Sequence, residues 1–336
     1  MQRLFWIGSP FFSASLAACG WEVRSFNFSE AAIYGWSDLV RMAGWEPDVV
    51  VVADKSRPPF VLGMEDFPCL TVFYCVDSHI HSWYPLYAQG FDICLVSLRD
   101  HLPWFQNMRL PDSRVWWSPP YARDTDAPDP TADMRWDCLF VGTSNPETLP
   151  GRGRFLAEVK ARFPGLHVTA GDYRSLFPHA RLLLNHCESG DLNFRVFEAL
   201  GCGGCLLTPR IAHGLTELFV DGEQLVMYGP DDADDAVAKM EMLLEDQELI
   251  EYIGRQGLHA VDAGHRARHR AQSFTDRMCD VWMEDPAHLI AHRRAHAAHI
   301  REQWLREPYL LLAQALPFPA LQHAYLSAAK GAFEGA

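Results

Sequence analysis

The sequence lacks long apolar runs and an excess of positive charge. No stretch of about 20 apolar residues is free of breakers, so we expect no membrane-spanning helix. The first eight residues lack the long apolar core of a secretory signal peptide. The 43 Asp and Glu residues outnumber the 29 Lys and Arg residues, and the formal charge is −14. This balance argues against nonspecific binding to nucleic acid or to an anionic membrane, but allows an anionic ligand in a locally basic cleft.

The sequence also lacks complete cysteine and glycine motifs. Its nine cysteines lie mostly in apolar runs, as Cys75 and Cys94 do, which is typical of free thiols in the cytoplasm rather than of a disulfide framework. Cys202 and Cys205 have the spacing of a redox or zinc half-site, but no second pair completes it, so packing is the favoured interpretation. The first apolar run ends at Gly8 without a GxGxxG pattern, which favours a simple turn there.

What the first 125 residues do contain is an alternation of short apolar runs with helical patterns. Four consecutive valines near residue 50 are typical of a strand buried on both faces. This alternation predicts a doubly wound parallel sheet of the α/β class. The strands expected here are 4–8, 22–28, 48–53, 69–76, 93–97 and 115–117, with helices ending at 18 and covering 30–43.

A second α/β series follows a segment rich in Asp, Pro and Ala. That segment, 126–135, has no periodicity and is interpreted as a linker between an N-terminal domain, 1–125, and a second domain, 136–275. The remaining residues, 276–336, are predicted to be a helical tail. The elements expected in the second domain are strands 136–141, 166–169, 182–185, 205–208 and 224–228, with helices 153–163, 232–244 and 247–256.

Four histidines recur in the tail at helical spacing. His288, His292, His296 and His299 would lie near one stripe of a helix. We favour a polar stripe on a docking helix over a zinc site, because no acidic or cysteine partner is evident. The Leu-rich end of the tail could contact a partner or, peripherally, a membrane surface.

The segment 192–204 carries charged residues ahead of a small-residue turn and a buried strand. A helix that begins near Asp191 would place Asp191, Arg195 and Glu198 on one face. A helix N-terminus attracts phosphate, and Arg195 adds a charged donor. Glu198 can accept hydrogen bonds from ribose hydroxyls, and Asn193 is expected as a ligand at the helix start. The alternative is an amphipathic helix with a surface Arg–Glu pair.

Two further segments follow predicted strands, at the edge where open α/β sheets bind ligands. Gly142, Thr143 and Ser144 end the first strand of the second domain, and a glycine there permits close approach of a ligand. In the first domain, an extended chain after residue 76 would point Asp77, His79 and His81 the same way.

One of these three side chains could take the proton from a hydroxyl group of a substrate, while Trp83 and Tyr84 could stack on a sugar ring. A metal site formed by Asp77, His79 and His81, or a structural polar loop, are the alternatives.

The ordered series of motifs in the second domain resembles the C-terminal domain of group 1 glycosyltransferases, and within them the branch labelled CgeB-like, or spore-maturation-like. The motifs are, in order, Leu184-Asn185, Asn193-x-Arg195-x-Phe197-Glu198-Ala199-Leu200-x-Cys202-Gly203, Gly214-Leu215-x-Glu217-Leu218-Phe219 and Asp221-Gly222-Glu223-x-Leu225. Gly257 and residues 265–270 resemble the closing helical motif of that branch.

The resemblance implies a GT-B fold, in which two Rossmann-like domains face a cleft and the last helices cross back to the first domain. It also implies a nucleotide-sugar donor on the second domain, an acceptor on the first, and no need for a metal or another cofactor. The donor would contact Gly142, Thr143, Ser144, Asn193, Arg195, Glu198 and Glu217. Relatives often carry an aspartate in the loop that holds Asp77. Many also carry a glutamate eight positions before Glu198, where this chain has Gly190.

The expected function is therefore transfer of a sugar from a nucleoside diphosphate to an acceptor hydroxyl of a glycan, a protein or a small molecule. The sequence does not choose between inversion and retention of configuration. Two alternatives stay open: a sugar-nucleotide epimerase of the same fold, and a noncatalytic protein that binds nucleotide sugars.

Overall fold

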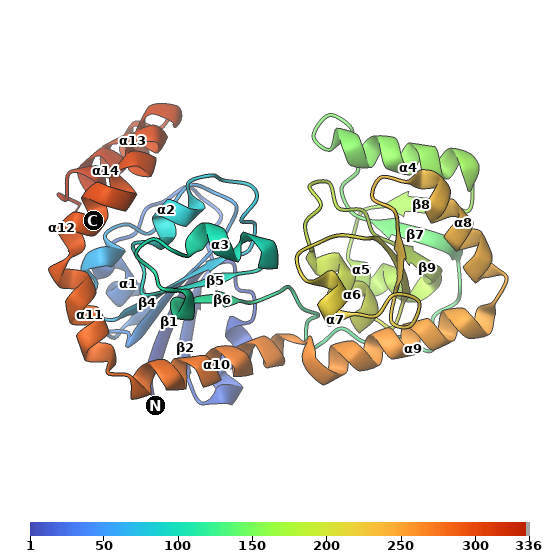
Figure 1. Ribbon diagram of the computed structural model, residues 1–336, viewed down its shortest axis with the longest axis horizontal. Coiled ribbons are helices and arrows are strands. Elements are labelled where there is room, and N and C mark those ends of the chain that lie inside the picture. Colours follow the sequence, from blue (N-terminus) through green and yellow to red (C-terminus); the bar gives the residue numbers. More distant parts are fainter. Residues whose placement is uncertain (334–336) are drawn as a thin grey trace. The chain divides into compact units, whose positions relative to one another are not determined.

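The computed structural model describes residues 1–333, which form two compact α/β units. One unit combines Met1–Ser118 with the chain from Arg270 onward, and the other is Pro119–His269. The chain thus passes from the first unit into the second and then returns (Figure 1). None of the helices in the described part of the chain is both long and apolar enough to span a membrane.

A parallel sheet of six strands forms the centre of the first unit, in the order β2-β1-β3-β4-β5-β6. Strands β3 and β4 are buried throughout because apolar residues occupy both of their faces. In the register between β1 and β3, Phe5 lies opposite Val50. The strands are β1 (Arg3–Gly8), β2 (Glu22–Phe26), β3 (Val49–Ala53), β4 (Leu70–Cys75), β5 (Ile93–Val96) and β6 (Val115–Trp117).

The helices of the first unit come from both ends of the chain. Helix α1 begins only at Trp36, not near residue 30, because the Asp38 carboxylate accepts the N–H of Gly35 and starts the helix there. The helix expected up to residue 18 is a 3₁₀ helix, Ser13–Cys19. The α-helices are α1 (Trp36–Ala43), α2 (Tyr84–Ala88), α3 (Leu102–Phe105), α10 (Ala267–Met283), α11 (Pro286–Ala295), α12 (Ala297–Ile300), α13 (Arg306–Ala315) and α14 (Pro319–Ala329).

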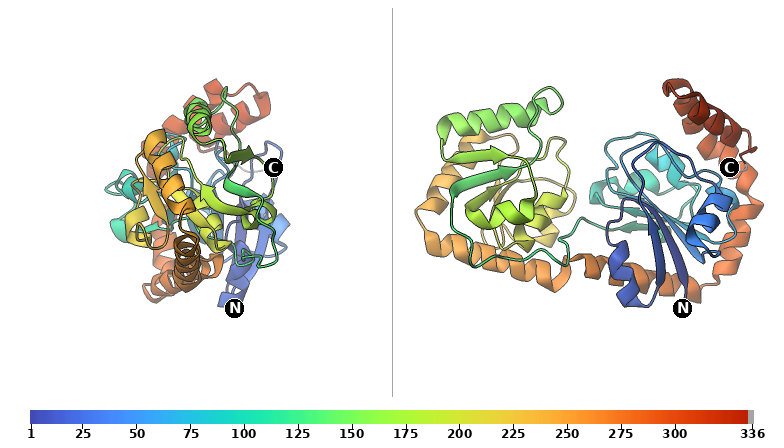
Figure 2. Two further views of the ribbon diagram at one scale, coloured as in Figure 1. Left: turned by 90° about the vertical axis from the view of Figure 1, so that its right-hand side faces the viewer. Right: turned by 180° about the vertical axis from the view of Figure 1, so that it is seen from behind.

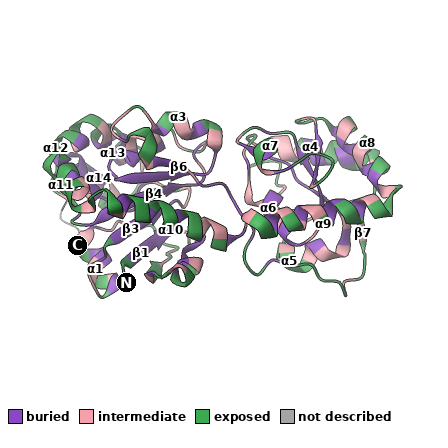
Figure 3. Cartoon of the chain, turned by 60° about the horizontal axis from the view of Figure 1, so that its bottom comes forward, coloured by how far each residue is buried: buried purple, intermediate pink, exposed green. Residues whose placement is uncertain are grey.

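The returning helices α10 to α14 pack on the first unit (Figure 2). Helix α10 buries Phe274, Met278 and Val281 along one stripe, while its other side is exposed (Figure 3). The ring of Phe274 packs on Phe12 and Trp21. The tail is therefore part of the core of the first unit.

A fully buried arginine anchors α11. Arg293 forms an ion pair with Asp92, and both side chains are inaccessible to solvent. Its guanidinium also donates to Thr71 Oγ1 (2.9 Å) and to the carbonyl oxygens of Phe67 and Cys69. Because every one of these partners lies in or near β4, Arg293 fixes the tail against the start of that strand.

A five-stranded parallel sheet forms the centre of the second unit, in the order β11-β10-β9-β7-β8. Helices α4 and α8 contact each other and the edge strands, while α6 and α9 contact each other and β10. The strands are β7 (Trp136–Val141), β8 (Leu166–Thr169), β9 (Ala180–Leu184), β10 (Cys205–Pro209) and β11 (Val226–Tyr228). The helices are α4 (Pro150–Arg162), α5 (Tyr173–Leu176), α6 (Phe194–Gly201), α7 (Leu215–Leu218), α8 (Ala233–Leu244) and α9 (Gln247–Gly264).

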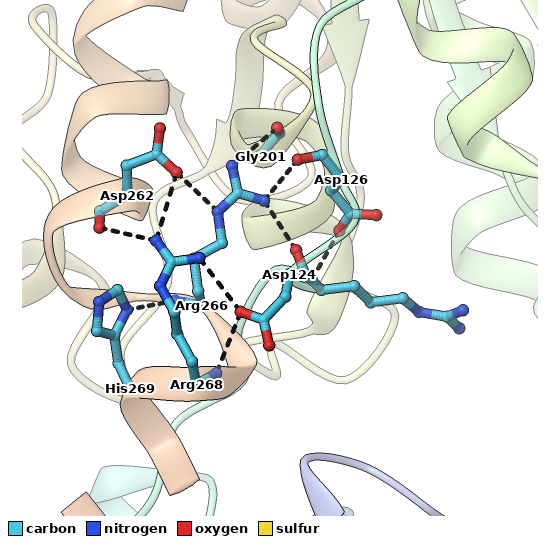
Figure 4. Close-up of polar contacts among 8 residues, drawn as sticks. Asp124, Asp126, Gly201, Asp262, Arg266, Arg268 and His269 are labelled. Atoms are coloured by element: carbon cyan, nitrogen blue, oxygen red, sulfur yellow. Dashed lines mark hydrogen bonds and ion pairs between the residues drawn. The ribbon is translucent and has the colours of Figure 1, made fainter. Parts of the chain in front are cut away.

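The segment that enters the second unit and the segment that leaves it are joined around Arg266 (Figure 4). This side chain is 4% exposed. It donates to the carbonyl oxygens of Arg123 (2.8 Å) and Asp126 (2.6 Å) and to the Asp262 carboxylate (2.8 Å). A backbone bridge pairs Ala122 with Arg266. These contacts hold the start of the expected linker against the α9–α10 junction.

Candidate functional site

The strand order of the second unit marks a ligand-binding edge. If the five strands are numbered from 1 (β7) to 5 (β11), their order across the sheet is 2-1-3-4-5. The connection after β7 therefore runs to one side of the sheet and the connection after β9 runs to the other, which makes a switch point between β7 and β9. Open α/β sheets bind ligands at the carboxyl ends of the strands at such a switch point. Gly142 follows β7 and Asn185 follows β9, so these residues flank the switch point.

Arg195 spans this switch point. Its Nε donates to the Val141 carbonyl (2.9 Å) and its Nη1 donates to Asn185 Oδ1 (2.8 Å). The guanidinium lies over the Phe140 ring, 4.8 Å from the ring centre. Burial lowers the pKa of Arg195, and the neighbouring charge of Arg152 lowers it further. The ends of β7 and β9 therefore hold a partly desolvated cation, which is a strong anion-binding group.

Gly142 is required by this placement. A Cβ at position 142 would lie 2.5 Å from Arg195 Nη2, and the residue has φ +156°. Only a residue without a side chain lets the guanidinium approach the backbone this closely. Thr143 is exposed and Ser144 is half-buried in the same loop, and the Thr143 carbonyl accepts from Arg152 Nη1 (3.0 Å).

Helix α6 starts three residues later than the sequence suggested. It begins at Phe194, with Asn193 as its N-cap, and not near Asp191. The reason is that the Asn193 side chain pairs with the Asn185 amide, with both N···O distances 3.3 Å, and holds residue 193 in an extended conformation. Asn193 is thus at the helix start, as expected. Asn185 was not among the predicted site residues, although an asparagine at the end of a predicted strand is a usable signal.

Glu198 lies one turn beyond Arg195 in a polar cluster of its own. Burial raises its pKa, the nearby Asp126 carboxylate raises it further and Arg195 opposes both effects, so that the pKa lies at about 7. Asp126 accepts hydrogen bonds from the Tyr173 hydroxyl (2.9 Å) and the Arg123 N–H (2.7 Å). A carboxyl group that titrates near neutrality can accept hydrogen bonds from sugar hydroxyls when it is ionised.

Glu188 caps a helix. Its carboxylate accepts the N–H groups of Gly151 (2.9 Å) and Arg152 (2.6 Å), in the first turn of α4. Gly190 lies in a turn with φ +71° and has no atom near the position of a Cβ. No carboxylate therefore stands at position 190, and the Glu188 carboxylate is committed to α4. Glu217, the last predicted donor ligand, is exposed on α7, which follows β10.

The prediction that the chain stays extended after β4 is wrong. Residues 78–80 form a turn, in which the Ile80 N–H donates to the Asp77 carbonyl (2.9 Å), so Asp77, His79 and His81 do not alternate as in a strand. The turn forms because the Asp54 carboxylate accepts the Asp77 N–H (3.1 Å) and Ser56 donates to the Asp77 carboxylate.

The two histidines of this turn have unused nitrogens. His79 Nδ1 and His81 Nε2 are inaccessible to solvent and have no hydrogen-bond partner among the described residues. The His81 ring stacks on Trp83, with 5.1 Å between the ring centres. Asp77, His79 and His81 remain at the carboxyl end of β4.

The prediction that Tyr84 stacks on a sugar ring is also wrong. Its side chain is 1% exposed, and its hydroxyl donates to Asp54 Oδ1 (2.6 Å). Its ring packs on Phe73 in the core. Helix α2 turns Tyr84 inward because its hydroxyl satisfies the buried Asp54 carboxylate. Trp83, at the start of the same helix, stays half-buried.

No group of three or more His, Cys, Asp or Glu side chains in residues 1–333 is arranged to hold a metal ion. His288, His292, His296 and His299 are exposed on α11 and α12, and the His292 and His296 rings lie 4.3 Å apart. Cys202 and Cys205 are buried, and burial raises the pKa of each thiol to about 12. The metal alternatives for these groups therefore find no support in the described residues.

Comparison with solved structures identifies the architecture. HepE from Anabaena, in complex with UDP and glucose, has a TM-score of 0.60 at 10% identity over 83% of this chain and 100% of that chain. Sucrose-phosphate synthase from Thermosynechococcus elongatus has a TM-score of 0.58 at 12% identity over 85% of this chain and 100% of that one.

The fold is GT-B.

The GT-B fold predicted from the sequence is thus confirmed. The pneumococcal O-GlcNAc transferase GtfA, in complex with UDP and GlcNAc, also matches, with a TM-score of 0.51 at 11% identity over 70% of this chain and 57% of that chain. Residues 140–276, which include most of the second unit, match a family model described as glycosyl transferase-like. No curated protein matches the sequence.

Proposed function

We propose that this GT-B protein is a nucleotide-sugar-dependent glycosyltransferase. The observation that carries the proposal is the Arg195 guanidinium, held across the β7–β9 switch point beside a glycine backbone. A diphosphate is the ligand that suits a desolvated arginine next to the N-terminus of an α-helix. The glycosyl transferase-like match over residues 140–276 supports the same assignment.

In the proposed reaction, the oxygen of an acceptor hydroxyl forms a bond to the anomeric carbon of the donor sugar. The bond from that carbon to the diphosphate oxygen breaks, and its electron pair leaves with the nucleoside diphosphate. Arg195 and the positive end of the α6 dipole stabilise the departing charge. If configuration inverts, Asp77 or one of the histidines beside it accepts the hydroxyl proton. If configuration is retained, these groups position the acceptor.

Several finer assignments belong to the proposal. Uracil is the base we favour, because HepE and GtfA were both solved with UDP. We also propose hexosyl transfer without a metal and placement in the CgeB-like branch, on the strength of the motif series. Nine free cysteines, eight of them buried or half-buried, favour the cytoplasm.

Nucleotide binding and turnover test the proposal separately. Thermal unfolding is followed with UDP, GDP, dTDP and CMP, and release of the same nucleotides is followed with their sugars. UDP at 100 times its dissociation constant should stabilise the protein by about 2.7 kcal/mol. Arg195→Gln should abolish this gain, whereas Arg255→Gln, on the exposed face of α9, should leave it intact. If no nucleotide shifts the transition, the donor site is refuted.

A noncatalytic binding protein is the second candidate. The observation in its favour is the missing carboxylate at Gly190 together with the commitment of Glu188 to α4. It predicts binding of UDP-sugars without release of UDP from any of them. An epimerase instead predicts a change of the donor sugar in the absence of any acceptor. Release of UDP that depends on an added acceptor excludes both alternatives.

A further inference from the structure

An apolar pocket opens in the first unit at the ligand-binding edge of its sheet. The strand order of this unit also starts 2-1-3, so the loops after β1 and β3 flank its switch point. The pocket has a volume of about 130 Å³ and lies between the loops that follow β2 and β3 and the tail helices α13 and α14. Its apolar wall includes Phe28, Phe60, Leu316, Phe318 and Leu321.

Two cationic side chains, Arg57 and Lys55, lie at this pocket, although the protein as a whole has a net charge of −14. Arg57 is the one charged residue among those that line it in the described chain. Its Nη1 donates to the Ser29 carbonyl (2.7 Å), and its side chain is otherwise exposed. Lys55 Nζ lies 5.0 Å from the centre of the Phe28 ring, which forms part of the pocket wall. An apolar hollow beside two cations suits an amphipathic anion.

The loop after β3 connects this pocket with the proposed acceptor groups. Ser56 donates to the Asp77 carboxylate, and the next residue, Arg57, lines the pocket. A molecule seated in the pocket would therefore present its polar end toward Asp77. The proline pair Pro58-Pro59 stiffens the connection, and the Tyr325 hydroxyl of α14 donates to the Pro59 carbonyl (2.6 Å).

We propose that the acceptor is an amphipathic anion, whose apolar group of about six carbons fills this pocket while its anionic group pairs with Arg57 and Lys55. The size follows from comparison with a cavity of about 150 Å³, which is large enough to hold benzene. This inference rests on the proposed transferase function, since it names the class of acceptor.

Calorimetry with the full chain tests the pocket, using hexyl phosphate as the probe. Hexyl phosphate should bind at least tenfold more tightly than inorganic phosphate or 1-hexanol. Phe318→Ser removes part of the wall and Ala32→Trp fills the hollow, and each should weaken hexyl phosphate binding at least tenfold. Arg57→Gln with Lys55→Gln should reduce the affinity for hexyl phosphate to that of 1-hexanol. Leu311→Ser is the matched control, because Leu311 is equally exposed on α13 but does not line the pocket.

Transfer to 2-hydroxyoctyl phosphate, which carries its hydroxyl next to the phosphate and six carbons beyond it, completes the test in the presence of UDP-sugars. Its product should disappear in Ala32→Trp while UDP binding is unchanged. Equal binding of hexyl phosphate to the Phe318→Ser, Ala32→Trp and wild-type proteins overturns the pocket, even if UDP-sugars are turned over. Pocket-dependent binding of hexyl phosphate without any UDP binding refutes the transferase and leaves the pocket standing. Turnover with other acceptors but none with this probe overturns the acceptor class.

Discussion

Single atoms decide the geometry of the proposed donor site. The Arg195 guanidinium lies so near the backbone of residue 142 that one methyl group would displace it. The same arginine is also the only group that contacts the ends of both β7 and β9 through its side chain among the hydrogen bonds we describe. Its position, more than its charge, makes it the centre of the site.

Gly142→Ala should therefore impair nucleotide binding. The new Cβ, 2.5 Å from Nη2, forces the guanidinium away from the switch point. Losing a charged hydrogen bond costs about 1.5–3 kcal/mol, so the affinity for UDP should fall about tenfold to a hundredfold. Titration calorimetry measures the change.

The matched control is Gly171→Ala. Gly171 follows the neighbouring strand β8 with nearly the same backbone angle, φ +152°, but its Cβ would meet only Leu176 Cδ1 at 3.3 Å. The Gly171→Ala variant therefore has a backbone strain similar to that of Gly142→Ala, but no clash with Arg195. Equal loss of UDP affinity in both variants would contradict the role given to Gly142.

Glu198 should make stability depend on pH. Its pKa is about 7 in the folded protein and 4.5 as an ordinary glutamate, because burial penalises the ionised form. Its favourable contribution to folding is therefore complete below pH 4.5 and is lost as the pH rises through about 7. Glu198→Gln should be more stable than the wild type at pH 8, by up to about 3 kcal/mol.

Urea unfolding at pH 8 and at pH 4.5 measures this difference, which should vanish at the lower pH. Glu251→Gln on the exposed face of α9 serves as the control and should change stability little at either pH. A Glu198→Gln variant that is less stable than the wild type at pH 8 would show that the ionised carboxylate is well solvated or paired.

At the scale of elements, the tail is an integral part of the first unit. Helix α11 carries Arg293, whose buried guanidinium contacts Asp92, Thr71 and the Cys69 carbonyl beside β4. Arg301, which directly follows α12, pairs with the buried Glu65 (2.9 Å). Two carboxylates of the first hundred residues thus depend on arginines supplied some two hundred residues later.

Arg293→Met should destabilise the first unit strongly. It leaves the Asp92 carboxylate buried without its counterion, and removal of one partner of a buried pair costs about 3–5 kcal/mol. Adding Asp92→Asn should restore part of the loss, because the buried charge is then gone. Urea unfolding followed by tryptophan fluorescence measures both variants, and strictly additive losses would argue against coupling of the pair.

Strands were the elements most predictable from the sequence, and particular residues show why. The valine run of β3 is buried on both faces, so its composition alone indicates a central strand. The turn at Asp77 was not predictable, because it depends on Asp54 and Ser56, which approach only when β3 and β4 pair.

The candidate site shows the same limit. The sequence places Gly142, Asn193 and Arg195 near strand and helix ends, where ligands bind. It does not reveal that Asp126, which was expected in a linker, is buried beside Tyr173 near Glu198. Nor does it distinguish Arg293 from Arg294, although Ala297 and Ile300 follow Arg293 at helical spacing and are buried with it.

At the scale of the whole molecule, the two units have separate hydrophobic cores and differ in their number of tryptophans. Ten of the eleven tryptophans lie in the first unit, and Trp136 alone lies in the second. Tryptophan fluorescence therefore reports unfolding of the first unit, whereas circular dichroism reports both.

UDP should raise the unfolding temperature of the second unit alone. At a hundredfold excess over its dissociation constant, the nucleotide should stabilise that unit by about 2.7 kcal/mol, because its proposed site lies entirely within residues 119–269. The circular dichroism transition should shift upward while the fluorescence transition stays in place. A common shift of both signals would show that the two units unfold as one cooperative body.

The first unit is built from two separate segments of the chain, and this determines the order in which the two units fold during synthesis. Domains fold as units while the chain emerges from the ribosome. Residues 119–269 can complete their sheet as soon as α9 has emerged, whereas β4 and β5 must wait for Arg293. Until then, the nascent chain holds an unfinished sheet with Asp92 lacking its counterion. The N-terminal third of this protein is therefore the last to mature, and a ribosome stalled before α11 would hold a folded second unit attached to an unfinished first one.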